Sequence, residues 1–197
     1  MTRTIFLFAL VLASGVAMAI EKPKYQVIEK FGDVQVRHYE SMIVARTRVT
    51  GSFEGAGNAA FRRLAKYIFG SNQRDQKISM TAPVSQTPDT ADVDGYWVTF
   101  MMPAKYRLED LPKPEDSAIE LVKLPPRTMA AIRYRGGWSE ELYKKNEAKL
   151  KQAVRASTSW KIIGEPVWAR YNSPMMLPMF RTNEILVPVK AVADEKN

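Results

Sequence analysis

The sequence predicts an α+β fold, in which a duplicated strand-strand-helix-strand-strand unit forms a mostly antiparallel, distorted barrel with two helices packed on it. Several short segments alternate apolar and polar residues with period two, which is typical of half-buried strands. Two longer segments place apolar residues at helical spacing. Both halves of the chain show these elements in the same order, and two amphipathic helices need a sheet to cover their apolar faces.

The first half contains one helix within a series of strands. Ser52 suits a helix cap, apolar side chains follow at helical spacing from Phe53, and Gly70 suits the end of the helix. We expect strands at residues 25–28, 34–39, 42–50, 78–84 and 96–102. Residues 103–114 contain three prolines and are interpreted as a connector.

The second half repeats this order. Gly136 and Gly137 interrupt the chain, Ser139 suits a second helix cap, and helical spacing continues over residues 142–155. We expect strands at residues 118–124, 129–134, 160–171 and 183–189.

The two halves correspond to pseudo-repeats over about residues 25–103 and 117–190. Each half alone is small for a stable core. We therefore assign residues 20–197 to a single domain.

The first nineteen residues have the composition of a secretory signal peptide. Arg3 gives a positive start, residues 5–13 form an apolar run, and Ala17 and Ala19 fit a cleavage site before Ile20. The alternative is an uncleaved membrane anchor, although the apolar run is short for a permanent span. We therefore expect an exported protein of the bacterial periplasm.

The composition excludes several kinds of chemistry. The chain has no cysteine, a single histidine, and a formal net charge of +8. These counts exclude disulfides, thiolate or multi-histidine metal sites and most catalytic triads. Motifs of serine hydrolases, phosphate-binding loops and zinc proteases are absent as well. The absence of these motifs favours a protein that is not an enzyme. Because the basic residues are scattered, we expect a solvated basic surface rather than a nucleic-acid-binding site.

A series of short motifs in a fixed order gives a more specific indication. They are VRHY at 36–39, YIFGSN at 67–72, KISMTAPV at 77–84, FMMP at 100–103, LPKP at 111–114, YNSP at 171–174 and RTNE at 181–184. This series resembles the SOUL family, also called the haem-binding protein 2 family, from about residue 25 to residue 189. The resemblance implies a duplicated α+β barrel that binds haem or another porphyrin and does not catalyse a reaction.

The resemblance also implies two binding modes. Some members are thought to ligate haem iron through a histidine in the Arg-His-Tyr motif, which is His38 here. Others are thought to bind the porphyrin in an apolar groove beside the first helix, under a late loop. On this chain the groove is lined by Asn58, Phe61, Arg62, Ala65 and Lys66, and the loop contains Met175, Met176 and Leu177. Arg62, Lys66 and Arg181 are the candidates for pairing with the propionates.

Each candidate also has an alternative interpretation. His38 can be a strand-end histidine bonded to backbone or water. The methionines at 175, 176 and 179 can contact haem, bind copper or pack on the core. Glu184 can be a buried acid beside a ligand.

We predict a non-catalytic, periplasmic haem- or tetrapyrrole-binding protein that sequesters or transports its ligand. The alternatives are a general module for apolar small ligands or partners, and an enzyme that uses the barrel cleft near Glu184. The expected partner is a small-molecule tetrapyrrole, with no stable membrane anchor after cleavage. The sequence leaves the oligomeric state open, and a monomer is the simplest expectation.

Overall fold

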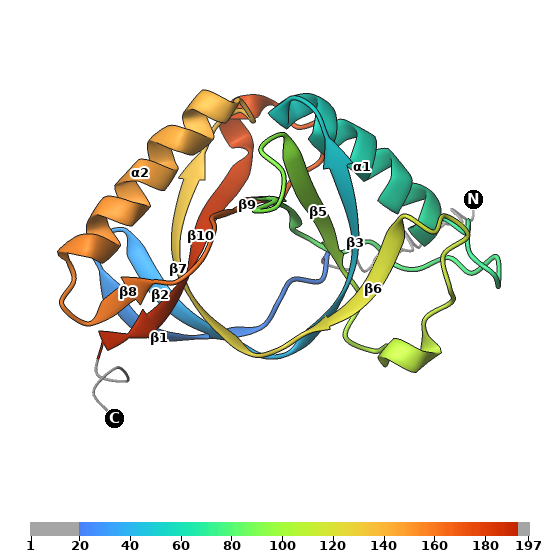
Figure 1. Ribbon diagram of the computed structural model, residues 1–197, viewed down its shortest axis with the longest axis horizontal. Coiled ribbons are helices and arrows are strands. Elements are labelled where there is room, and N and C mark those ends of the chain that lie inside the picture. The colour runs from blue at the N-terminus through green and yellow to red at the C-terminus, as the bar shows by residue number, and fades with distance from the viewer. Residues whose placement is uncertain (1–19, 193–197) are drawn as a thin grey trace, which may run out of the picture.

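The computed structural model describes residues 20–192, which form ten strands, two α-helices and two short 3-10 helices (Figure 1). In chain order the elements are β1 (Tyr25–Phe31), β2 (Val34–Tyr39), β3 (Met42–Thr50), α1 (Phe53–Ile68), β4 (Val84–Pro88), β5 (Gly95–Met101), η1 (Leu108–Asp110), β6 (Ile119–Leu124), β7 (Arg127–Arg135), α2 (Glu140–Ala156), β8 (Trp160–Ile162), β9 (Val167–Arg170), η2 (Pro178–Phe180) and β10 (Thr182–Ala191). The predicted signal peptide, residues 1–19, lies outside the described residues.

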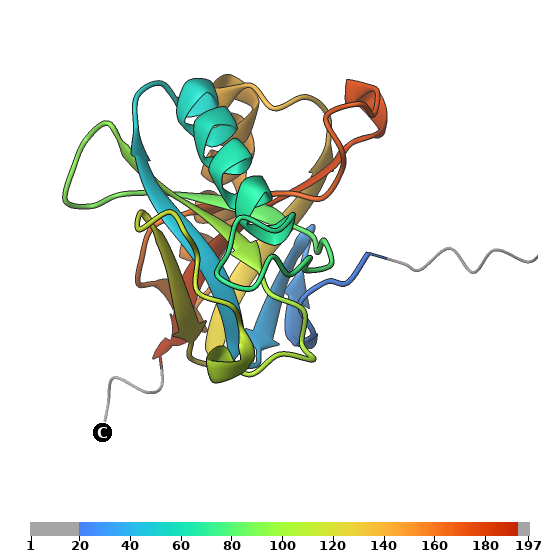
Figure 2. The same ribbon diagram turned by 90° about the vertical axis from the view of Figure 1, so that its right-hand side faces the viewer.

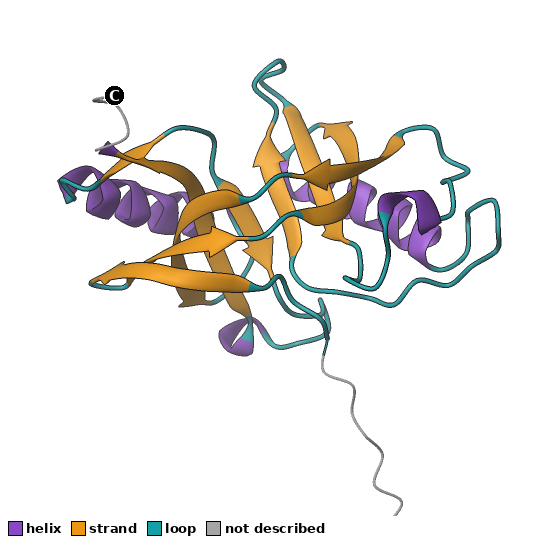
Figure 3. Ribbon diagram, turned by 90° about the horizontal axis from the view of Figure 1, so that it is seen from below, coloured by secondary structure: helices purple, strands orange, loops and turns teal. Residues whose placement is uncertain are grey.

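The strands form one curled sheet in the order β1-β2-β7-β10-β9-β4-β5-β3-β6, and β8 pairs with β10. Every strand pair within the described chain is antiparallel. The curl makes a half-barrel with β1 and β6 as its edges, and both helices lie on the outer side of the curl (Figure 3). The α+β class predicted from the sequence is confirmed.

The two predicted pseudo-repeats exchange their first strands. β2, β3, α1, β4 and β5 in the first half correspond in order to β6, β7, α2, β9 and β10 in the second. However, β2 pairs with β7 of the second half, and β6 pairs with β3 of the first. The pairing of β4 with β9 joins the halves at the centre, and the exchanged strands extend the same continuous sheet on each side.

Each helix covers its own part of the outer face. α1 packs on β3 and β5 through Leu64 and Tyr67, while α2 packs on β7 and β10 through Tyr143 and Leu150. All four side chains are fully buried. The caps are those predicted, since Ser52 and Ser139 accept hydrogen bonds from backbone N–H groups three residues ahead. Burial of these apolar faces fixes both helices against the sheet.

The inner face of the sheet, turned away from the helices, carries a smaller cluster. Its buried members are Tyr39, Met129, Ala131, Ala169 and Leu186. Polar and charged side chains lie beside this cluster, so the inner face is chemically different from the helix-covered face.

Two strand predictions were wrong in detail. The expected strand at 78–84 is mostly irregular, and β4 runs from Val84 to Pro88 instead. Ile78 and Ala82 are buried, but their N–H groups donate to Ile68 and Glu21 rather than to a ladder. Met80, which lies between them in the alternation, is exposed, so the pattern reflects burial only at Ile78 and Ala82 and no strand pairing.

The expected strand at 160–171 is interrupted. It divides into β8 and β9 because residues 163–166, which include Gly164 and Pro166, leave the sheet. Among residues 20–192, no helix has the length and apolar character needed to cross a membrane.

Candidate functional site

The loop between β9 and β10 exposes a group of apolar side chains. We call residues 173–180 the methionine loop. Its exposed apolar members are Met175, Met176, Leu177, Met179 and Phe180, with Met175 91% and Leu177 60% exposed. Arg181 holds the backbone of the loop in place, because its Nε donates to the Met176 carbonyl at 2.8 Å and its Nη2 to the Pro174 carbonyl at 2.7 Å. The loop is therefore an ordered apolar surface in contact with water, which is the condition expected of a binding surface.

Two arginines flank Trp138 at the base of this loop. The Arg181 guanidinium lies 4.2 Å from the centre of the Trp138 ring, and the Arg170 guanidinium lies 5.4 Å from it. The Trp138 indole N–H donates to Asn183 Oδ1 at 2.9 Å, which fixes the ring. This cluster offers an aromatic surface and two cations beside the apolar loop.

Arg170 also connects the cluster to α1. Its guanidinium lies 5.6 Å from the centre of the Phe53 ring. A Cβ atom at Gly57 would come within 3.1 Å of Arg170 Nη1, and within 2.8 Å of Gln86 Oε1. Glycine at position 57 therefore allows Arg170 to approach the helix closely.

The predicted residues of α1 lie on its outer side. Asn58, Arg62 and Lys66 are exposed, whereas Phe61 and Ala65 are half-buried. Phe61 packs on the Phe100 ring at 5.5 Å between centres. Arg62 and Lys66 form no ion pair with any residue in the range 20–192, so both are available to an anionic group.

The methionine loop does not cover this face of α1. Figure 2 shows the loop standing away from the helix, with the connection between β7 and α2 between them. The structure therefore presents two neighbouring surfaces, joined by Trp138 and Arg170, rather than one closed groove.

His38 lies at the opposite end of the sheet from the loop. Its half-buried ring is 3.3 Å from the Thr128 hydroxyl (Nδ1 to Oγ1), and His38 pairs with Thr128 in β7. The loop returns to the sheet at Arg135, which pairs with Thr182. A strand rises about 3.3 Å per residue, so these two points of β7 are roughly 23 Å apart. His38 and the methionine loop consequently cannot contact the same iron atom.

Glu184 lies on the inner face and is completely buried. Its carboxylate accepts hydrogen bonds from Arg37 at 2.9 and 3.1 Å and from Tyr171 at 2.7 Å. Arg133 adds contacts to Oε1 at 2.9 Å from Nε and 2.8 Å from Nη2. Both carboxylate oxygens are thus occupied by donors from three residues.

These donors control the protonation of Glu184. Burial alone would raise the pKa of Glu184, but the hydrogen bonds and charge of Arg37, with the contacts from Tyr171 and Arg133, hold the pKa below its ordinary value. An ionised carboxylate with both oxygens occupied is poorly suited to accept or deliver a proton near neutral pH. Within residues 20–192 there is also no group of three or more His, Asp or Glu side chains that could hold a metal ion.

The sequence-based prediction missed Arg170 as a possible contact for a ligand. Nothing local distinguishes it, because its position beside Trp138 and Phe53 depends on β9 lying between β10 and β4. The Gly57 position was a weak signal, since a glycine on the buried side of a helix indicates close approach of another group.

Known proteins resemble this chain over most of its length. The family model described as SOUL heme-binding protein matches residues 20–188. The chain is 30% identical over 154 residues to heme-binding protein 1 of Xenopus tropicalis, covering 76% of this chain and 80% of that protein. It is 28% identical over 192 residues to heme-binding protein 2 of Homo sapiens, covering 92% of each. The solved EcmrR C-terminal domain has a TM-score of 0.63 at 12% identity, covering 85% of this chain and 99% of that domain, which shows a shared fold.

Proposed function

This chain belongs to the SOUL heme-binding protein family, and we propose on that premise that it binds haem or a related tetrapyrrole without catalysing a reaction on it. The observation that supports a binding site is the methionine loop, an ordered apolar surface open to solvent. A flat macrocycle is apolar over most of its area, so its contact with this loop removes apolar surface of both the ring and the loop from water. Flexible methionine side chains adapt well to such a ring.

The basic residues near the loop suit the propionates. Arg181 lies beneath the loop and Arg170 lies beside Trp138, while Arg62 and Lys66 are exposed on α1. Arg181 and Arg170 already donate from Nε and Nη2 to groups of the chain, so each offers a propionate only its remaining N–H groups. The exposed Arg62 can bind a carboxylate with two parallel hydrogen bonds, which would orient the ring as well as stabilise it. We propose that the ring contacts the methionine loop and Trp138, and that its propionates point toward these cations.

The environment of Glu184 supports a role without catalysis. An enzyme that used the inner cleft would need a group able to exchange a proton, and Glu184 is held ionised by Arg37, Arg133 and Tyr171. In the proposed function this carboxylate stabilises the fold and does not touch the ligand.

We also propose that the protein acts after export to the periplasm, where it would sequester or transport its ligand. The support is the composition of residues 1–19, which lie outside the described residues. Detection of a mature chain beginning at Ile20 in a periplasmic fraction would test this part.

An absorbance titration of residues 20–197 with ferric haem and with iron-free protoporphyrin IX tests the proposed function. We expect saturable one-to-one binding of both, because the loop contacts the ring rather than the iron. Binding of haem alone would assign iron ligation, which His38→Ala then tests by its effect on the Soret band. If neither ligand saturates, the proposed function is wrong.

A loop variant identifies the surface. The triple substitution Met175→Ser, Met176→Ser and Leu177→Ser is expected to weaken porphyrin binding at least tenfold, which corresponds to about 1.4 kcal/mol. Val93→Ser is the control, because Val93 is a fully exposed apolar residue in the loop between β4 and β5, away from the methionine loop. Equal affinities of the two variants would place the ring elsewhere.

A further inference from the structure

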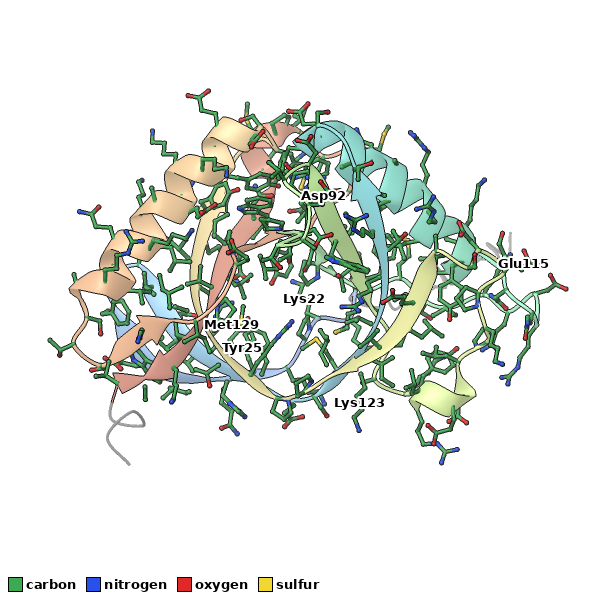
Figure 4. All side chains as sticks on the ribbon, in the orientation of Figure 1. Lys22, Tyr25, Asp92, Glu115, Lys123 and Met129 are labelled. Carbon is green, nitrogen blue, oxygen red and sulfur yellow. The ribbon has the colours of Figure 1, made fainter. Side chains whose placement is uncertain are left out.

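A small chamber lies on the inner face of the sheet, away from the methionine loop and from α1. Its volume is about 90 Å³, and strands from both halves line it. Its polar lining residues are Tyr39, Ser85, Thr87, Thr99, Arg127 and Tyr171, and its apolar walls include Met42, Met101, Met129 and Leu186. Figure 4 shows Met129 on the inner side of the curled sheet.

Among the residues that the structure describes, Arg127 is the only charged side chain that lines this chamber, and it forms no ion pair with them. The side chain is half-buried, and its Nε–H is buried without a hydrogen-bond acceptor. No Asp or Glu in the described part of the chain forms an ion pair with it. Burial lowers the pKa of Arg127, as expected for a cation that lacks a counter-charge. A buried polar group without a partner costs stability, so an acceptor from outside the chain would be stabilising.

Other donors in the chamber suit an anion. Tyr39 is directly opposite Arg127 in the β2–β7 ladder. Burial raises the pKa of Tyr39 to about 12, so its hydroxyl stays protonated; it accepts from Arg37 at 3.1 Å and keeps its own proton to donate. The hydroxyls of Ser85, Thr87 and Thr99 form no side-chain hydrogen bond to another described residue. A single guanidinium with several hydroxyls matches a monoanion such as a carboxylate.

The chamber adjoins a larger groove through three shared residues. The groove has a volume of about 470 Å³ and lies at the edge of the half-barrel, and both cavities are lined by Pro23, Met42 and Met101. The groove combines apolar residues, among them Ile43, Met102, Tyr106 and Leu108, with charged side chains, which are Glu21, Lys22, Lys24, Glu40, Arg107, Glu109 and Lys123. The segment before β1 passes along the groove, and the Lys22 ammonium lies 5.8 Å from the centre of the Tyr171 ring. Met42 and Met101 line both cavities, so an apolar tail attached to a head group in the chamber would contact these two side chains and then the apolar residues of the groove.

We propose that the chamber and groove bind an amphipathic carboxylate of the medium-chain fatty acid class, with its carboxylate on Arg127 and Tyr39 and its tail in the groove. This site is separate from the tetrapyrrole surface, since neither cavity is lined by any of the predicted tetrapyrrole-site residues. The chain would thus bind two kinds of ligand, at its outer loop and inside its sheet.

Calorimetric titration of residues 20–197 with octanoate tests this site, with 1-octanol as the uncharged ligand of the same length. We expect saturable one-to-one binding of octanoate and at least tenfold weaker binding of 1-octanol. Arg127→Met, which keeps an apolar side chain of similar length, is expected to weaken octanoate at least tenfold while leaving the protoporphyrin titration unchanged. Arg135→Met is the control, because it removes the same charge from an exposed position of β7.

Methionine-methyl NMR gives an independent readout that needs no variant. Octanoate is expected to shift the methyl signals of Met42, Met101 and Met129 and to leave those of Met175 and Met179 in place. The proposal is overturned if octanoate binding does not saturate, or if 1-octanol binds with equal affinity. It is also overturned if Arg127→Met binds octanoate with unchanged affinity, or if octanoate shifts only the methyl signals of the loop methionines. Failure of porphyrin binding alone would contradict the proposed function and not this site.

Discussion

Arg37 and Arg127 both lie on the inner face of the curled sheet, on the neighbouring strands β2 and β7. Arg37 is buried and forms two hydrogen bonds to Glu184, whose charge raises the pKa of Arg37 against the lowering effect of burial. Arg127 faces a chamber with a buried Nε–H that has no acceptor among the described residues. The difference shows that one arginine is part of the folded structure, whereas the other lacks a counter-charge that a ligand can supply.

Among the proposed substitutions, Glu184→Gln is expected to have the largest effect on the free energy of unfolding. It leaves Arg37 buried without a counter-charge, so the free energy of unfolding should fall by about 3–5 kcal/mol in urea titrations. The control is Glu120→Gln, which breaks the exposed pair with Arg46 and should change stability by less than about 1 kcal/mol. Equal effects of the two substitutions would show that the buried cluster does not stabilise the fold.

Acidification should reduce the contribution of ionised Glu184 to the stability of the fold. The pKa of Glu184 is lower in the folded chain than its ordinary value of 4.5, so its contribution to stability is complete above pH 4.5. It is lost as the pH falls through the folded pKa. The stability difference between the wild type and Glu184→Gln should therefore shrink below pH 4.5. A difference that grows with acid would contradict the assignment of Glu184 as an ionised group.

Arg127→Met should change stability in the opposite direction from Glu184→Gln. Removal of a half-buried cation with an unsatisfied N–H is expected to raise the free energy of unfolding by about 1 kcal/mol, the lower end of the cost of an unpaired polar group. Thermal unfolding in ligand-free buffer measures this. A loss of stability would mean that Arg127 has a structural partner.

The triple serine variant of the methionine loop should have the smallest effect on folding. Met175 and Leu177 are mostly exposed, so their replacement should change the free energy of unfolding by no more than about 0.5 kcal/mol. The same variant is expected to weaken porphyrin binding tenfold. A large loss of stability would assign the loop to the core, which is one of the alternatives that the sequence left open.

The helices and strands that were predicted correctly are those marked by residues close together in the sequence, such as caps and regular apolar spacing. Ser52 and Gly70 bound a helix whose apolar spacing is visible without tertiary information, and the structure places α1 between them. The strand expected at 78–84 was wrong because its alternation comes from Ile78 and Ala82 entering the core without a ladder. The exchange of β2 and β6 between the halves also has no local signal.

The motifs that identified the family are largely structural. The buried Asn72 side chain bonds to Tyr67, Arg74 and Gln76 backbone groups and fixes the turn after α1. The Tyr67 hydroxyl donates to the carbonyl of Pro112, which joins two of the motifs. Such residues specify the fold strongly and the ligand weakly. The match of the family model over residues 20–188 confirms the family resemblance, while the site residues stay predictions.

The candidate site depended on contacts distant in the sequence. Positions of His38 and the methionine loop at opposite ends of β7 follow from strand register, which the sequence did not provide. The chamber around Arg127 was not predicted either, because its lining comes from strands spread over both halves.

Methionine-methyl NMR of residues 20–197 with iron-free protoporphyrin IX shows most directly whether the tetrapyrrole binds at the methionine loop. Methionines mark both surfaces, with Met175, Met176 and Met179 in the loop and Met42, Met101 and Met129 around the chamber. Ring-current shifts confined to the loop methionines are the predicted result. Shifts at the chamber methionines with an unperturbed loop would contradict the assignment of the tetrapyrrole to the methionine loop.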